Sequence, residues 1–89
     1  MLHEKEKKLL AKLFGQTVQK RREQKKLLRM DLANRLHMQH TRIVQLESGK
    51  IDPRMSTVLA VAAALDVTPG VLLNGMASEW RAARMGEME

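Results

Sequence analysis

Apolar residues in the first quarter of the chain recur at the spacing of an amphipathic helix. Leu10, Phe14 and Val18 lie four positions apart, and Arg22 continues the same spacing. Residues 4–25 contain no proline, and charged side chains fill the opposite face. The pattern predicts one long helix, or a short helix joined to a second near Gly15.

Two short apolar patterns follow, separated only by residues 37–40. Their inward positions are Leu32, Ala33, Leu36, Met38, Ile43 and Leu46. Counted from Arg29, this spacing matches a helix-turn-helix unit over residues 29–48, in which the small Ala33 lets the two helices touch. Any helical hairpin would have an aliphatic seam, but six matching positions and a helix stop at Gly49 favour the helix-turn-helix unit.

A loop separates this unit from a fourth helix. Asp52 followed by Pro53 marks the loop. Ser56 or Thr57 is a candidate N-cap, because a side-chain oxygen there can accept a backbone N–H of the first turn. The helix itself is predicted over residues 58–65, where the apolar side chains share one face.

A fifth helix is predicted to begin where Thr68 precedes Pro69, a cap followed by proline at the first helical position. We expect it to end at Gly75. Residues 78–85, around Trp80, could form a short extra C-terminal helix. The sequence shows no strand pattern, so the predicted fold class is all-α with five helices.

Composition narrows the class of protein. Phe14 and Trp80 are the only aromatic residues, so the core must be aliphatic. The absence of cysteine excludes a disulfide framework and a thiolate zinc site, and it fits a reducing compartment. No apolar run approaches the roughly 18–20 residues that span a bilayer, and no apolar signal core follows the charged start of the chain. We therefore expect a soluble cytoplasmic protein.

Positive charge is concentrated near the N-terminus. Basic residues outnumber acidic ones by ten to three in residues 1–30 and by four to three in residues 31–54, whereas acidic residues lead by four to two in residues 55–89. Together with the net charge of +6, this asymmetry suggests a face that meets a polyanion. The alternatives are a solvated surface, or docking of residues 5–26 on an anionic membrane or an acidic partner, which would divert the apolar stripe from the core.

No residue pattern suggests catalysis. The histidines are His3, His37 and His40, and the serines and aspartates form no nucleophile pattern. A metal site at His37 and His40 would lack acidic neighbours. We expect neither enzymatic activity nor a bound metal ion or cofactor.

Taken together, these motifs resemble the Cro and phage-repressor family, also called the xenobiotic-response-element type of helix-turn-helix protein. The segments that carry the resemblance are Phe14-Gly15, Val18, Arg22, Leu32-Ala33, 43–50, Pro53, 57–65 and 67–75. The resemblance implies a five-helix, lambda-repressor-like domain over residues 14–75 that binds operator DNA, usually as a homodimer, in a prokaryotic or phage protein associated with the nucleoid. Residues 1–13 would be a basic extension of the first helix, and residues 76–89 a C-terminal tail.

The chain departs from the family at four turn and cap positions. Lys26 and His37 stand where the family usually has glycine, at points where the backbone prefers a left-handed turn, which histidine tolerates better than lysine. Leu28 replaces the usual Ser or Thr cap of the second helix, a loss of roughly 1 kcal/mol. Gln39 similarly replaces a better cap of the third helix. We expect these changes to affect stability and helix boundaries rather than the fold.

The third helix is the expected recognition helix, whose N-terminal half would enter the major groove. With Ile43 and Leu46 facing inward, the residues left to read bases are Gln39, His40, Thr41, Val44 and Gln45. Glutamine amides can pair with adenine, histidine can donate to guanine, and Thr41 and Val44 can contact a thymine methyl. Val44 could instead be a partly exposed packing residue.

Phosphate contacts are expected beside this helix. The candidate residues are Arg29, Arg42, Lys50 and Arg54. Arg29 opens the second helix, where its side chain and backbone N–H groups could meet one phosphate. Each of these charges could also be merely solvated. The family resemblance further implies a structural ion pair between Arg22 and Glu47 that fixes the angle of the recognition helix.

The biological role stays open at this point. A dimeric transcriptional repressor is the first interpretation, and an antitoxin that binds a protein toxin through residues 1–13 or 76–89 is the second; restriction–modification controllers are similarly small. Met76, Trp80 and Met85 could seal a homodimer interface or hold a toxin. Alternatively, Trp80 covers the core.

Overall fold

The computed structural model describes residues 3–88, with side chains as far as Ala83. Five helices follow one another along the chain: α1 (Glu4–Gln24), α2 (Arg29–Leu36), α3 (His40–Glu47), α4 (Met55–Ala64) and α5 (Pro69–Met88). The part of the chain that the structure describes contains no strand. The prediction of an all-α fold with five helices is confirmed.

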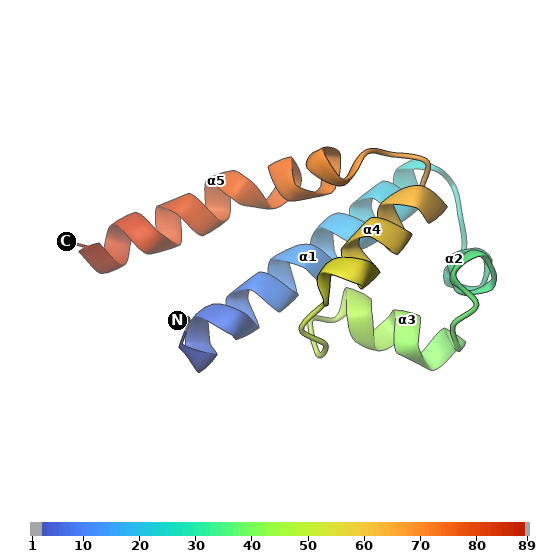
Figure 1. Cartoon of the computed structure of the whole chain (residues 1–89), viewed down its shortest axis with the longest axis horizontal. Coiled ribbons are helices and arrows are strands. Elements are labelled where there is room, and N and C mark those ends of the chain that lie inside the picture. The colour runs from blue at the N-terminus through green and yellow to red at the C-terminus, as the bar shows by residue number, and fades with distance from the viewer. Residues whose placement is uncertain (1–2, 89) are drawn as a thin grey trace.

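The two long helices, α1 and α5, run antiparallel, and the three short helices lie on one side of this pair (Figure 1). Helix α1 packs against both α5 and α3, and α4 packs against both α2 and α5. The fold measures 43 × 21 × 19 Å. It is elongated because α1 and α5 have 21 and 20 residues, which gives each helix a length of about 30 Å.

One aliphatic core lies where the helices meet. Its largest fully buried side chains are Phe14, Leu32, Ile43, Leu46, Leu65, Leu72, Val18 and Val61. Every helix contributes to this core, so detaching any one helix would expose part of the core to solvent. Leu36 and Met38 are partly buried against this cluster, on the inward side that the sequence pattern predicted.

Helix α1 passes through Gly15 without a break. A Cβ at this position would lie 2.4 Å from the carbonyl oxygen of Leu46 and 2.6 Å from that of Glu47. Glycine therefore allows the backbone of α1 to touch the last turn of α3. Of the two alternatives from the sequence, the single long helix is correct, and the break near Gly15 is wrong.

Helix α5 also passes through a glycine, so its predicted end at Gly75 is wrong. The separate short C-terminal helix is wrong as well, because α5 continues to Met88. Gly75 lies against α1, where a Cβ would be 2.9 Å from Cγ2 of Thr17. Packing on α1 thus offsets the roughly 1 kcal/mol by which glycine weakens an isolated helix. The apolar stripe of α5 crosses this point through Leu72, Met76 and Trp80.

Helix α4 begins earlier than its predicted caps. Arg54 is the N-cap, with an extended ψ of 159°, and its carbonyl accepts the N–H of Val58 at 3.0 Å. Ser56 and Thr57 lie inside the first turn, so the prediction that either caps the helix is wrong. Val58 is thus the fourth residue of the helix, and its side chain is buried.

The predicted cap of α5 is confirmed. Pro69 is the first residue of the helix, and Oγ1 of Thr68 accepts the N–H of Val71 at 3.3 Å. At α2, Leu28 is the N-cap and its side chain accepts no hydrogen bond, but Oδ2 of Asp31 accepts the N–H of Leu28 at 2.7 Å. Half of a capping box therefore remains and offsets part of the expected loss.

Three non-glycine residues follow helices in the left-handed conformation, namely Lys26 (φ 57°), His37 (φ 54°) and Asp66 (φ 56°). The first two are the positions where the family usually has glycine, so the expected left-handed turns are confirmed. At His37 the turn closes through a hydrogen bond from the N–H of Met38 to the carbonyl of Ala33, 3.0 Å long, as in a Schellman motif. Asp66 was not predicted.

Within residues 3–88, no single helix has both the length and the apolar composition needed to cross a membrane. In this range, α4 and Pro69–Ala83 reach that length and apolar composition only when they are taken together, and the two helices are bent by 115° relative to each other.

Candidate nucleic-acid interface

Helix α3 is held by its apolar side and presents its polar side to solvent. Ile43 and Leu46 are buried in the core. The candidate base-reading residues Gln39, His40, Thr41 and Gln45 are exposed, and Val44 is 39% exposed. In Figure 1, α3 lies along the side of the molecule opposite α5. The five residues proposed from the sequence thus share one short, accessible ridge.

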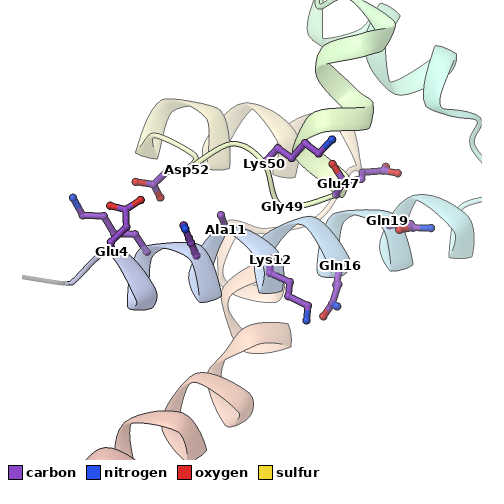
Figure 2. A pocket seen from close by; sticks show the side chains of 12 residues that line it. Glu4, Ala11, Lys12, Gln16, Gln19, Glu47, Gly49, Lys50 and Asp52 are labelled. Carbon is purple, nitrogen blue, oxygen red and sulfur yellow. The ribbon is translucent and has the colours of Figure 1, made fainter.

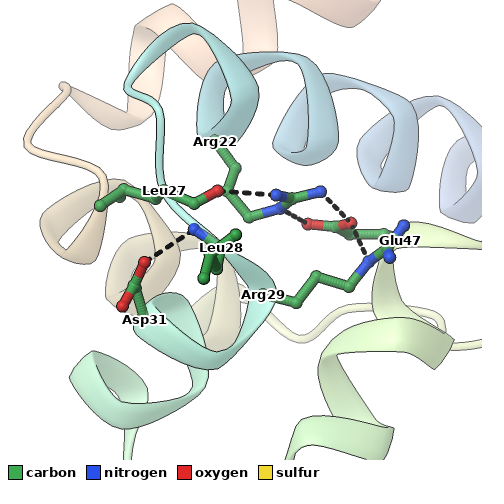
Figure 3. Close-up of polar contacts among 6 residues, drawn as sticks. All are labelled: Arg22, Leu27, Leu28, Arg29, Asp31 and Glu47. Atoms are coloured by element: carbon green, nitrogen blue, oxygen red, sulfur yellow. Dashed lines mark hydrogen bonds and ion pairs between the residues drawn. The ribbon is translucent and has the colours of Figure 1, made fainter.

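The C-terminal end of α3 is fixed by a buried carboxylate between two arginines (Figure 3). Nε of Arg22 donates to Oε2 of Glu47 at 2.7 Å, and a terminal nitrogen of Arg22 donates to Oε1 at 3.2 Å. Nε of Arg29 donates to the same Oε1 at 2.9 Å. The side chain of Glu47 is only 2% exposed. These contacts tie α3 to both α1 and the start of α2.

Arg22 also joins the helices to the loop between α1 and α2. Its Nη1 donates to the carbonyl of Leu27 at 2.7 Å. The hydrogen bond to Glu47 raises the pKa of the Arg22 guanidinium above its ordinary value, although burial opposes this shift. Arg22 therefore stays charged whenever the domain is folded, and the buried carboxylate always has a cationic partner.

Arg29 has a second role that sequence reasoning missed. It was proposed as a phosphate contact, and the structure places its Nε on Glu47. The two residues lie 18 positions apart, so no local spacing rule links them. The Arg29 side chain remains 40% exposed, and among the described residues its other guanidinium nitrogens have no hydrogen-bond partner. The guanidinium is thus oriented by Glu47 and still open to solvent.

A profile of the family described as "Helix-turn-helix domain" matches residues 13–74. The chain belongs to this helix-turn-helix family, in its Cro and phage-repressor type. The match includes the unit predicted over residues 29–48 and almost all of the core.

A solved structure supports the same assignment for this helix-turn-helix chain. The restriction-modification controller protein C.AhdI from Aeromonas hydrophila is similar to it, with a TM-score of 0.66 and 27% sequence identity, over 70% of this chain and 94% of that one. A search of the curated proteins finds no match. Family and structural likeness together indicate a DNA-binding regulator.

The other basic residues proposed from the sequence come from three neighbouring segments. Arg42 lies in the first turn of α3, Lys50 in the loop after it, and Arg54 at the N-cap of α4. All three are exposed, and none forms an ion pair with another described residue. Their positive charges are therefore available to an external anion.

Two of the three residues considered for a C-terminal contact belong to the domain itself. Met76 is buried in the core, and Trp80 packs against it while partly buried. Trp80 thus covers the core, as one interpretation of the sequence had it. The side chain of Met85 lies outside the described part of the structure.

Proposed function

We propose that this helix-turn-helix protein represses transcription by binding a pseudo-palindromic DNA operator as a homodimer. The observation that carries the proposal is the polar ridge of α3, exposed along one side and fixed from behind by Ile43, Leu46 and the buried Glu47. A ridge of this kind can meet base edges without paying a large ordering entropy on binding.

The chemistry of the ridge suits a mixed sequence that contains A·T steps. Gln39 and Gln45 can each form a bidentate pair with adenine, and His40 can donate to guanine. Thr41 and Val44 can contact thymine methyl groups. Each good bidentate pair contributes about 1–3 kcal/mol of discrimination against the wrong base.

Phosphate contacts would position this ridge on the duplex. Arg42 within α3, Lys50 in the loop after it and Arg54 at the N-cap of α4 are exposed cations. Arg29 adds a guanidinium that Glu47 already orients, beside the N-terminus of α2, where backbone N–H groups also favour an anion. Such contacts fix register and orientation but carry no sequence information.

Dimerisation would involve α4, which is apolar on nearly every side. Besides its buried face it exposes Met55, at 66%, and Leu59, at 50%. A helix that is hydrophobic all round is normally buried, and a second copy of the chain would cover this one. Two-fold pairing would also present two recognition helices about 34 Å apart, one helical turn of DNA.

No specific observation favours the antitoxin alternative. Met76 and Trp80, two candidate toxin contacts, are engaged in the core of the domain. The family and the likeness to a controller protein support a regulatory, non-enzymatic role, which we place in the cytoplasm at the nucleoid, without a cofactor.

Selection of bound sites from a random DNA pool tests this function. We expect the wild-type protein to enrich a two-fold symmetric site and the triple variant Gln39→Ala/Thr41→Ala/Gln45→Ala to lose that preference while keeping its melting temperature. A matched control, Gln24→Ala/Asn34→Ala/Ser78→Ala, removes three exposed polar groups outside α3 and should select the wild-type site. Unchanged preference in the folded triple variant of α3 would refute the proposal.

A further inference from the structure

An open groove lies between α1 and the loop that follows α3 (Figure 2). Its volume is about 860 Å³. One wall is the solvent side of α1, and the other is the loop, including Ser48, Gly49 and Lys50. The walls meet where Gly49 approaches α1 so closely that a Cβ on it would lie 2.8 Å from Cα of Lys12. The groove therefore begins at the C-terminal end of the recognition helix.

Lysines dominate the charge of this groove. Four of them line it: Lys7, Lys8, Lys12 and Lys50. Its acidic residues are Glu4, Asp52 and Glu47, and the carboxylate of Glu47 is already neutralised by Arg22 and Arg29. None of the four lysines forms an ion pair with a described residue. The groove thus has a net positive charge without an internal partner.

The α1 wall is a regular stripe rather than a compact pocket. Lys8, Lys12, Gln16 and Gln19 line it at intervals of four, four and three residues, so they share one face of the helix. From Lys8 to Gln19 this stripe extends about 16 Å, at 1.5 Å per residue. Both lysines and Gln16 are exposed, and within residues 3–88 no buried side-chain N or O atom lacks a hydrogen-bond partner. An extended polyanion suits this surface better than a small enclosed ligand.

The groove is continuous with the side of the molecule that carries the recognition helix. In Figure 1, the start of α1, the loop after α3 and α3 itself lie along one side, and α5 lies along the other. Lys50 points along the groove toward the end of α3 in Figure 2. A duplex read by α3 would therefore continue past this loop toward the first half of α1.

We propose that this groove binds the sugar-phosphate backbone of the same DNA duplex, beyond the bases that α3 reads, with Lys8 and Lys12 as its phosphate contacts. The inference rests on the proposed function and adds a second binding site outside the helix-turn-helix unit. The N-terminal half of α1 then has a task besides packing. It adds affinity that depends on salt and not on sequence.

The test compares Lys8→Ala/Lys12→Ala with Lys20→Ala, which removes an exposed lysine of the same helix that does not line this groove. Alanine favours helix, so both variants should keep the wild-type melting temperature. Affinity for the selected operator is measured over a range of salt concentrations. Protection of the DNA backbone is measured by hydroxyl-radical footprinting. Each phosphate contact contributes about 0.9 to the magnitude of the slope of log K against log salt. The magnitude of this slope should therefore fall by about 1.8 per bound protomer in the double variant, and it should not change in Lys20→Ala.

The double variant should also lose backbone protection at the outer edge of the footprint while selecting the same bases as the wild type. If Lys8→Ala/Lys12→Ala has the same salt slope and footprint as Lys20→Ala, the inference is overturned. This holds even if the groove of the wild-type protein binds an acidic peptide such as polyglutamate, because the groove would then bind a partner other than DNA. Failure of the proposed function is distinguishable, because the wild-type protein would then select no operator at all.

Discussion

Helices α3 and α4 are similar in length, with 8 and 10 residues, but the side chains that they expose differ in polarity. Helix α3 buries Ile43, Leu46 and Glu47 and exposes polar side chains. Helix α4 buries Val58, Val61 and Ala62 and exposes further apolar side chains. The difference suggests that the two helices bind partners in different ways. Helix α3 can form hydrogen bonds with a partner, whereas α4 can bury apolar surface against one.

The two helices are also anchored differently. Helix α3 is held by a buried carboxylate and by backbone contact with α1 at Gly15, both of which depend on exact geometry. Helix α4 is held mainly by aliphatic packing, which tolerates side-chain changes that conserve volume, and by one exposed hydrogen bond from Nη1 of Arg35 to the carbonyl of Ala64 at 2.9 Å. An element that reads hydrogen-bond patterns needs a fixed angle, and the anchoring of α3 provides one.

Glu47→Ala should break the anchoring of α3 most severely. It leaves the buried guanidinium of Arg22 without its carboxylate partner, and removing one member of a buried pair costs about 3–5 kcal/mol. Each kcal/mol corresponds to a fall of roughly 4–8 °C in Tm for a domain of this size. Calorimetry or circular dichroism should record this loss, whereas Glu79→Ala, at an exposed site on α5, should stay within about 0.5 kcal/mol. Wild-type stability of Glu47→Ala with lost DNA binding would refute the structural role.

Gly15→Ala should have the next largest effect on stability. The added methyl group would overlap the carbonyl oxygens at the end of α3, and overpacking of this kind costs about 1–3 kcal/mol, more than the roughly 1 kcal/mol that alanine gains in a helix. The matched control is Gly70→Ala, where the nearest atom is 3.8 Å from the added Cβ. Urea titrations should show a lower midpoint for Gly15→Ala alone; equal midpoints would mean that α1 and α3 can move apart at little cost.

Leu59→Gln tests whether the exposed apolar surface of α4 is the dimer contact. Leu59 is one of two large apolar side chains that α4 exposes, and its replacement should weaken self-association by about tenfold or more, since burial of a leucine contributes about 1.5–3 kcal/mol. The monomer should keep its stability, because Leu59 is 50% exposed. Sedimentation equilibrium measures the effect, with Leu28→Gln as a control at an equally apolar residue outside α4, 69% exposed. If both variants associate like the wild type, α4 is not the dimer surface.

Arg29→Gln should have the smallest effect on folding and a clear effect on binding. The Arg29 side chain is 40% exposed, so its ion pair contributes only about 0–1 kcal/mol to stability. Loss of one phosphate contact should reduce the salt slope of DNA binding by about 0.9 per protomer. Arg81→Gln, at an exposed position of α5, supplies the control. An unaltered slope together with a large loss of stability would assign Arg29 to the fold alone.

Much of the fold could be predicted from the sequence because the decisive signals are local. The 29–48 unit follows from the spacing of small and apolar side chains, and the start of α5 follows from a cap and a proline that are adjacent in the chain. The candidate base-reading set could be derived from helical periodicity, which turns Ile43 and Leu46 inward, together with the chemistry of the outward residues, which sets Arg42 aside for phosphate. Their role in reading DNA remains a prediction.

The errors concern helix ends, and the one at Gly75 was decided by a residue far along the chain. Gly75 has the local signal of a helix end, but contact with Thr17 of α1 carries α5 through it. Ser56 and Thr57 have the side chains of N-caps, but α4 begins at Met55, which leaves them within its first turn.

By itself, the sequence determined the all-α class, the place of the 29–48 unit, which helix faces are apolar, and that positive charge gathers in the first third of the chain. These properties depend on neighbours within about two helical turns. Only the tertiary structure decided that Glu47 accepts from Arg29 as well as Arg22, and that Lys12 meets the loop after α3. Such contacts join positions that no helical period relates, because packing of the whole core sets the distances between them.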